Sequence, residues 1–353
     1  MLRATLLLVC LCLPALAEDA VLFRDVTVIP MDRDGRLEHQ DVLVTEGRIV
    51  AVRPSAKTPA SARVIDGRGK FLLPGLCDMH VHNWYEEEHV LFLANGVTTI
   101  RNMWGSPQHL RWAQAIREGR RSGPDLHTTG PILDGSPPVW QGSVVLTSPV
   151  EARAEVRRQA KAGYPALKVY NRLSAEVYAA VVAEAREQGL RVEGHVPKAV
   201  GIEAALSAGQ DSIEHLDGCF RWGAEFDLDR TADLARRSRA AGAVHCPTLV
   251  VYRKIVPAEE ARALRSRVEM RYVPPRLRAT WDPDKDFRFK GMSAAQFEML
   301  RRTDEVRMRI TKGLHDAGVV LLAGTDAGNP FVIAGWSLHE ELQLLVEACL
   351  LYT

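Results

Sequence analysis

The chain has 353 residues, of which 46% are hydrophobic and 25% are charged, and its formal net charge is +1 at pH 7. This is the composition of a globular protein that is large enough to bury a sizeable core. The balanced charge excludes a global electrostatic field that would attract nucleic acid or an anionic membrane.

The first 17 residues have the pattern of a cleavable secretory signal. Arg3 is followed by the apolar run Thr5 to Leu13 and then by the small-residue ending Ala15-Leu16-Ala17. The run is shorter than the roughly 20 residues that cross a bilayer, and no later segment qualifies as a span. Because Arg3 is the one charged residue of this signal, its removal would leave 44 basic and 44 acidic side chains. We therefore expect export to the periplasm or medium, with no membrane contact after cleavage.

Residues 18–70 predict the first part of a small β-domain. VLFRDVTVIP alternates apolar and polar residues, and DVLVTEGRIVAVRP predicts two strands around a tight turn at Glu46-Gly47. About 50 residues of strands and turns are too few to be stable alone, so this region should pack against another part of the protein.

Residues 71–353 alternate strand patterns with amphipathic helix patterns. We expect strands at 76–82, 97–102, 126–130, 165–170, 190–195, 211–215, 243–250 and 319–325. Gly163 should end one helix, and Ser174 and Gly189 should begin and end the next. Eight such units predict an α/β fold, a (β/α)₈ TIM barrel, with long connections at 131–148 and 252–292 over the carboxyl ends of the strands.

Side chains that can bind metals stand at the ends of these expected strands. Side chains alternate along a strand, so His80 and His82 should point the same way. The others are Lys168, His195, His215 and Asp326. Alone, each histidine is more often a hydrogen-bonded surface group, and Asp326 could simply begin a turn. A barrel brings all of these strand ends into one ring, and four imidazoles with a carboxylate suffice for one or two divalent cations of the zinc type.

Lys168 is unusual because the alternation of ALKVY places it inside the barrel. Burial disfavours the ammonium form, and a neutral amine can react with carbon dioxide to give a carboxylate that bridges two metals. The alternative is a lysine that is paired with a nearby carboxylate.

The segments PGLCDMHVH, GVTTIRNM, LKVYNRLS, VEGHVP, SIEHLDG and AGTDAG resemble those of the amidohydrolase superfamily. The resemblance is to its imidazolonepropionase-like and Xaa-Pro dipeptidase (prolidase)-like branch. It implies a metal-bearing barrel with a small β-sandwich domain built from both ends of the chain. It also implies that His80, His82 and Asp326 hold one metal, that His195 and His215 hold a second, and that carboxylated Lys168 bridges them, with two zinc ions as the expected pair.

The chain departs from that family at two places. Asn102 stands where relatives commonly have an acid, outside the expected ligand set. The sequence ends at CLLYT, where the family continues with another helix and the returning strands, so we expect the C-terminal half of the small domain to be missing. Apolar edges of the residue 21–70 sheet would then lie uncovered.

The resemblance implies hydrolysis of a non-ester C–N bond, an amide or peptide bond of a dipeptide or N-acyl amino acid, by a metal-bridging hydroxide. Asp326 would act as general base and then as acid, and Tyr170, which lies on the same face as Lys168, could donate to the oxyanion. Arg253 is a weaker candidate for binding a substrate carboxylate.

Two alternatives stay open. One is a mononuclear cyclic-amide hydrolase of the imidazolonepropionase type, in which Lys168 is not carboxylated and one metal is bound. The other is a truncated, non-catalytic metal-binding remnant. The expected partner is a small-molecule amide or dipeptide, and not a nucleic acid, while a homo-oligomer is left open.

Overall fold

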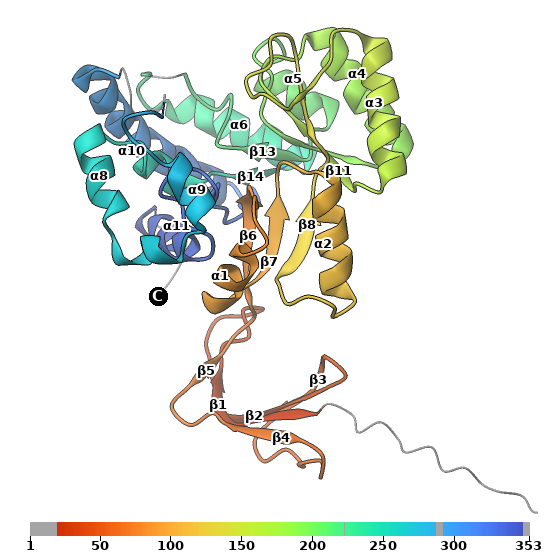
Figure 1. Cartoon of the computed structure of the whole chain (residues 1–353), viewed down its shortest axis with the longest axis vertical. Helices are drawn as coiled ribbons and strands as arrows, with labels where there is room; N and C mark the ends of the chain where they lie inside the picture. The colour runs from red at the N-terminus through yellow and green to blue at the C-terminus, as the bar shows by residue number, and fades with distance from the viewer. Residues whose placement is uncertain (1–19, 222, 287–291, 349–353) are drawn as a thin grey trace, which may run out of the picture. The chain divides into compact units, whose positions relative to one another are not determined.

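The computed structural model describes residues 20–221, 223–286 and 292–348, and Figure 1 shows the whole chain. The chain divides into two compact units, Met1–Gly75 and Leu76–Thr353. The predicted signal, residues 1–17, lies outside the described residues. Within the described part of the chain, no helix is both long and apolar enough to cross a membrane.

The first unit contains one five-stranded sheet. Its strands are β1 (Val21–Val28), β2 (Leu37–Thr45), β3 (Arg48–Arg53), β4 (Arg63–Asp66) and β5 (Phe71–Leu72). They have the order β3-β2-β1-β4, with β5 paired to β1, and β1 is antiparallel to β2 but parallel to β4 and β5. The predicted turn is confirmed: Glu46 and Gly47 connect β2 to β3 with φ values of 51° and 72°. Two positive φ values suit the right-handed twist of a hairpin.

One face of this sheet carries a small core of Val26, Val28 and Val42. The described residues of the first unit form one sheet, so the predicted β-sandwich, which needs two facing sheets, is not confirmed.

The second unit is built on parallel strands in two sheets. The first sheet has the order β6-β7-β8, and the second has the order β10-β9-β11-β12-β13-β14. The bounds are β6 (Leu76–Val81), β7 (Val97–Asn102), β8 (Asp125–Thr128), β9 (Ile132–Asp134), β10 (Val144–Val145), β11 (Ala166–Val169), β12 (Arg191–Gly194), β13 (Ser212–Glu214) and β14 (Val244–Cys246). Every pair in these two sheets is parallel, as alternating strand and helix patterns require.

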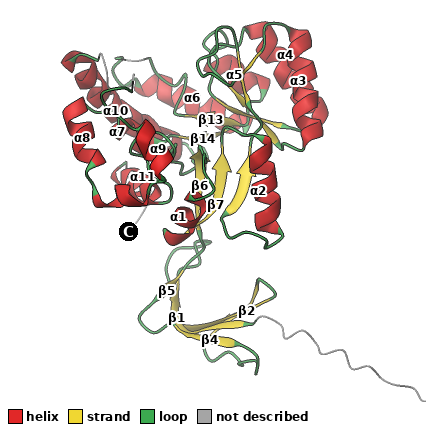
Figure 2. Ribbon diagram, in the orientation of Figure 1, coloured by secondary structure: helices red, strands yellow, loops and turns green. Residues whose placement is uncertain are grey.

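Helices follow most of these strands, and Figure 2 shows them in red. They are α1 (Glu88–Ala94), α2 (Pro107–Arg117), α3 (Pro149–Ala162), α4 (Ala175–Gln188), α5 (Ile202–Ala208), α6 (Leu228–Ala241), α7 (Leu249–Arg253), α8 (Ala258–Arg265), α9 (Pro275–Thr280), α10 (Ala294–Asp316) and α11 (Trp336–Glu347), with a 3₁₀ helix at Val268–Tyr272. Apolar side chains of α3, α4, α5, α6 and α10 pack on β9, β11, β12 and β13, whereas those of α1, α2, α7 and α11 pack on β6 to β8.

The predicted helix ends at residues 163, 174 and 189 are confirmed. The hydroxyl of Ser174 accepts a hydrogen bond from the Val177 amide at the start of α4. Gly163 and Gly189 end α3 and α4 with φ values of 92° and 69°, a left-handed conformation that glycine adopts without a steric penalty.

Seven of the eight predicted strands correspond to β6, β7, β8, β11, β12, β13 and β14, and the eighth differs. Residues 319–325 form one isolated bridge, between Leu321 and His245. The amide of Leu322 donates to the carbonyl of His245, and the amide of Met79 donates to the carbonyl of Ala323. The segment thus shares its hydrogen bonds between β14 and β6, which leaves too few on either side for a continuous ladder.

Three further expectations need correction. The predicted strand 243–250 ends at Cys246 because Thr248 is left-handed (φ 50°) and α7 begins at Leu249. The predicted connection 131–148 contains β9 and β10, and β9 pairs with β11 inside the sheet. The second predicted connection, 252–292, contains α8, the 3₁₀ helix and α9. The structure confirms a mixed α/β fold with parallel sheets.

Candidate metal centre and active site

The strand ends of the second unit bring the predicted histidines together. His80 lies within β6, and the other three histidines directly follow β6, β12 and β13. The ring centroids of His80 and His82 are 5.5 Å apart, those of His80 and His215 are 4.5 Å apart, and those of His215 and His195 are 4.7 Å apart. Four imidazoles from three strands therefore form one continuous group.

Asp326 joins this group from the segment between β14 and β6. Its Oδ1 atom lies 3.0 Å from Nε2 of His82 and 3.5 Å from Nε2 of His80. The ligand atoms of these three residues all lie within 4.8 Å of one another. Asp326 has a φ of 62° and His215 has a φ of 61°, a left-handed conformation that is uncommon outside glycine. Such strain often marks functional sites, because the surrounding fold must hold it in place.

Several of these atoms are buried without a hydrogen bond. Nε2 of His80 has no hydrogen-bond partner in the described structure, and Oδ1 of Asp326 lies beside the ring nitrogens of His80 and His82. Burial, with a contribution from the nearby Lys168 charge, lowers the pKa of His80 to about 4, so the ring is neutral and its lone pair is available. Because buried polar groups are normally paired, these atoms fit ligands that share a cation.

Lys168 lies in β11 and is only 1% exposed. Its Nζ atom has no hydrogen-bond partner among the described residues, which disagrees with the alternative of a simple structural ion pair. Burial lowers the pKa of this amine. The chemistry of the site therefore fits a lysine that becomes a carboxylate by reaction with carbon dioxide.

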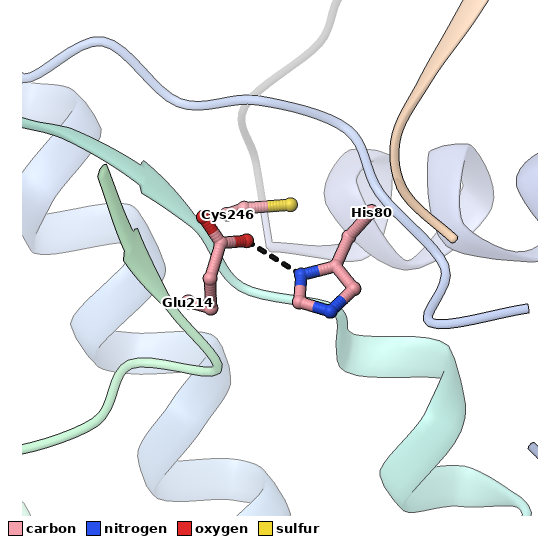
Figure 3. Close-up of side chains that lie close together, drawn as sticks. All are labelled: His80, Glu214 and Cys246. Carbon is pink, nitrogen blue, oxygen red and sulfur yellow. Dashed lines mark hydrogen bonds and ion pairs between the residues drawn. The ribbon is translucent and has the colours of Figure 1, made fainter. Parts of the chain in front are cut away.

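Each of three imidazole rings is held in place by a hydrogen-bond partner that was not predicted from the sequence. The Nδ1 atom of His80 lies 2.6 Å from Oε2 of Glu214 (Figure 3). Nδ1 of His195 lies 2.6 Å from Asp217, and Nδ1 of His215 lies 2.7 Å from the hydroxyl of Thr248. These partners accept the Nδ1 proton, which leaves Nε2 of each ring free to bind a metal. The sequence feature that could have indicated two of these partners is the pair of acids, Glu214 and Asp217, on either side of His215 in SIEHLDG.

Glu214 is itself held by a buried cation. Nη2 of Arg101, a residue of β7, donates to Oε1 of Glu214 at 2.9 Å, and Nε of Arg101 donates to the carbonyl of Met79 at 2.7 Å. The guanidinium also lies 3.2 Å from Glu193. This ion pair compensates the burial of the Glu214 charge beneath the histidines.

A second group, His80, Glu214 and Cys246, could also hold a metal by proximity alone (Figure 3). However, Nδ1 of His80 is already bonded to Glu214, which also binds Arg101. Burial raises the pKa of the Cys246 thiol, which disfavours the thiolate that binds metals. We interpret this group as support for His80 rather than as a separate metal site.

A cavity of about 580 Å³ opens beside these ligands. His82, His195, His215, Asp326 and Tyr170 contribute to its wall. The Tyr170 ring lies 4.0 Å from the ring of His195, between centroids. Its hydroxyl accepts a hydrogen bond of 2.7 Å from the indole of Trp140, and burial raises the pKa of Tyr170. The phenol therefore keeps a proton that it can donate into the cavity, as expected for an oxyanion donor.

The structure places two other noted residues outside the cavity wall. Arg253 lies in α7 and forms an ion pair with Asp304. Asn102 is fully buried and accepts a hydrogen bond from the Asn83 amide at 2.9 Å while donating to Thr128 at 3.0 Å. Its amide therefore connects the ends of β6, β7 and β8.

Comparisons with known proteins show which solved structures have a similar fold. The fold is similar to that of bottromycin amidohydrolase, with 28% identity and a TM-score of 0.77. The similarity covers 96% of this chain and 75% of that enzyme. A putative prolidase from Bifidobacterium longum matches 94% of this chain and 79% of its own, with 25% identity and a TM-score of 0.71. The chain is similar over nearly all of its length to solved members of the amidohydrolase superfamily. This confirms the resemblance seen in the sequence.

The curated relatives of this chain are similar to it over short stretches. Dihydroorotase from Carboxydothermus hydrogenoformans is 46% identical over 54 residues, which cover 15% of this chain and 12% of that enzyme. Adenine deaminase from Deinococcus deserti is 31% identical over 129 residues, 33% of this chain and 22% of the relative. The match thus spans about an eighth of the dihydroorotase and about a fifth of the deaminase. A comparison with family models finds no match.

Proposed function

We propose that this protein is a metal-dependent amidohydrolase. It would hydrolyse the carbon–nitrogen bond of a small amide or peptide. The observation that carries the proposal is the convergence of His80, His82 and Asp326 on one place, where the buried Nε2 atom of His80 forms no hydrogen bond. The similar solved structures, an amidohydrolase and a prolidase, support the same reaction class.

His80, His82 and Asp326 would hold one divalent cation, and His195 and His215 would hold a second. Carboxylated Lys168 would bridge them, because its buried amine has no other partner. Imidazole and carboxylate donors suit zinc. Such cations supply a water that is acidified to a pKa near neutrality and a Lewis acid that polarises the scissile carbonyl.

The protein's own groups would complete the reaction. Asp326, at the edge of the cavity, would accept a proton from the attacking water and return it to the leaving nitrogen. Tyr170 would donate its proton in a hydrogen bond to the developing oxyanion, since its oxygen is already oriented by Trp140. The largely apolar wall of the cavity would limit competing water.

We also propose that the second unit is a (β/α)₈ barrel. The segment with Val320 and Leu322 bonded to His245 continues to Ala323 and Ala327, which bond to β6. These contacts support a ring of eight parallel segments. The β-sheet of residues 21–72 would then be part of the small accessory domain.

A mononuclear hydrolase of cyclic amides is the second candidate. It is favoured by one observation: His80, His82 and Asp326 form a complete three-ligand group, whereas His195 and His215 have no protein carboxylate of their own in the group. The two candidates differ in metal count. Dipeptides and N-acyl amino acids remain the proposed substrates of the two-metal enzyme.

The test is metal removal and return. Purified protein should lose hydrolysis of N-acyl amino acid and dipeptide libraries after treatment with a chelator and regain it when zinc is added. Elemental analysis should give about two metals per chain, whereas one metal would favour the cyclic-amide hydrolase. Bound metal without hydrolysis of any amide in the libraries would favour a non-catalytic remnant.

A further inference from the structure

An arc of aromatic rings extends from one side of the metal centre around the cavity to the other. The rings of His82 and Trp84 stack at 5.8 Å, and Trp84 meets Trp104 edge to face at 5.2 Å. The Trp104 and Trp140 rings are 6.4 Å apart, and the Trp140 indole donates to the hydroxyl of Tyr170. All five residues line the cavity. Flat aromatic faces bind aromatic or bulky apolar groups and, at low entropic cost, hold them in one orientation.

Away from the proposed metal ligands, the charged side chains at the wall do not favour an anionic substrate. Apart from the histidines, Lys254 is the one basic residue among the described residues that line the cavity. Its Nζ atom lies 2.8 Å from Glu340. Glu340 also accepts a hydrogen bond from Arg267, which pairs in addition with Glu269. Two cations are therefore balanced by two carboxylates. A substrate carboxylate beside Lys254 would have to compete with Glu340 or remain buried without a partner, and both are costly.

One residue of the wall has an uncharged hydrogen-bond donor that is buried and unpaired. Trp281 lines the cavity and is 1% exposed, and its Nε1 has no hydrogen-bond partner in the described structure. An indole N–H can pair with a neutral carbonyl without the desolvation cost of a charged group. A carbonyl on the substrate would satisfy this donor.

We propose that this cavity selects uncharged amides that carry an aromatic group, in preference to free dipeptides or N-acyl amino acids with a terminal carboxylate. The aromatic group packs on the arc from Trp84 to Trp140, and a neutral carbonyl accepts from Trp281. The inference rests on the proposed reaction, hydrolysis of a C–N bond, and replaces dipeptides and N-acyl amino acids by neutral aromatic amides as its preferred substrates.

Binding of two matched ligands tests the inference separately from turnover. N-benzenesulfonyl-phenylalaninamide is neutral, and N-benzenesulfonyl-phenylalanine is anionic. In both ligands a sulfonamide replaces the aryl carboxamide that the enzyme is proposed to cleave. Isothermal titration of the metal-loaded protein should give at least tenfold tighter binding of the neutral ligand. Equal or tighter binding of the anion would overturn the inference, whether or not any amide is hydrolysed.

Two variants locate the site. Trp104→Leu should weaken binding of the neutral ligand at least tenfold while metal content stays unchanged. Tyr272→Leu, a matched change at an exposed ring that does not line the cavity, should leave both affinities unchanged. An unchanged affinity in Trp104→Leu would show that the arc is not the binding surface and would overturn the proposal.

Hydrolysis of the benzoyl analogues of these two ligands, in which a carboxamide replaces the sulfonamide, is a separate readout. If the proposed function holds, benzoyl-phenylalaninamide should be cleaved to benzoate with a kcat/KM at least tenfold above that of benzoyl-phenylalanine. Absence of any hydrolysis, together with selective binding of the neutral sulfonamide, would contradict the proposed function and leave the substrate class supported. A higher kcat/KM for the carboxylate would overturn the substrate class alone.

Discussion

Nδ1 of His80 lies 2.6 Å from Oε2 of Glu214, a residue 134 positions further along the chain. The two side chains belong to different sheets, since His80 is in β6 and Glu214 ends β13. Because the carboxylate accepts the Nδ1 proton, it fixes the ring tautomer and turns Nε2 towards Asp326. The proposed metal centre thus depends on a carboxylate that is not itself one of its proposed ligands.

Glu214→Gln should therefore weaken metal binding. Glutamine keeps the shape of the side chain but removes the charge that Arg101 and His80 share, and loss of such an outer partner typically costs 10- to 100-fold in metal affinity. Competition with a zinc chelator measures the change. Glu176→Gln, at an exposed position of α4, is the matched control. Equal affinities in both variants would assign Glu214 a purely structural role.

Lys168→Ala tests the proposed bridge. The change removes the group that both metals would share, so metal content should fall from about two per chain towards one, and kcat should fall by several orders of magnitude. Added acetate or propionate should restore part of the metal, because a small carboxylate can fill the space left by the side chain. Inductively coupled plasma mass spectrometry gives the count.

Lys161→Ala, at an exposed lysine of α3, is the control for Lys168→Ala and should change neither quantity. A Lys168→Ala protein with two metals and full turnover would rule out the bridge. If the wild-type protein and Lys168→Ala both hold one metal, the mononuclear enzyme becomes the better description.

Glu341 should make stability depend on pH. Burial raises its pKa to about 8, although the amides of Leu249 and Val250 donate to its oxygens at 3.0 and 2.6 Å and act in the opposite direction. Between pH 4.5 and 8 the unfolded chain has released this proton while the folded chain keeps it. Stability therefore falls as pH rises through this range, by up to about 1.4 kcal/mol per pH unit from this group.

Glu341→Gln removes that titration. The melting temperature of the wild-type protein, relative to that of the variant, should decrease from pH 5 to pH 8. Glu305→Gln, at an exposed position of α10, should show the wild-type pH dependence. Parallel pH profiles for wild type and Glu341→Gln would mean that Glu341 does not stay protonated in the folded state.

Export is the remaining proposal from the sequence. The pattern Ala15-Leu16-Ala17 predicts cleavage after Ala17, so the exported protein should begin at Glu18. Intact-mass measurement of protein from the native host, fractionated into cytosol and exported material, provides the check. A full-length chain confined to the cytosol would contradict the proposal.

Much of the fold could be predicted because its signals are local. The Glu46-Gly47 turn, the caps at Ser174 and Gly189 and seven of the parallel strands depend on residues that are close in sequence. The eighth strand could not be predicted correctly, since its hydrogen bonds depend on two neighbours, β14 and β6, that are distant along the chain. The same limit applies to β9 and β10, which lie in a segment rich in proline and glycine.

The sequence by itself determined the types of metal-binding side chain and their positions at strand ends, because alternation along a strand and the regular strand–helix order fix those positions. Only the tertiary structure decided which groups meet. Glu214 reaches His80, Asp217 reaches His195, and Trp84 to Trp140 line one cavity. The physical reason is that hydrogen bonds and ring contacts form between side chains that folding brings within a few ångströms, whatever their separation along the chain.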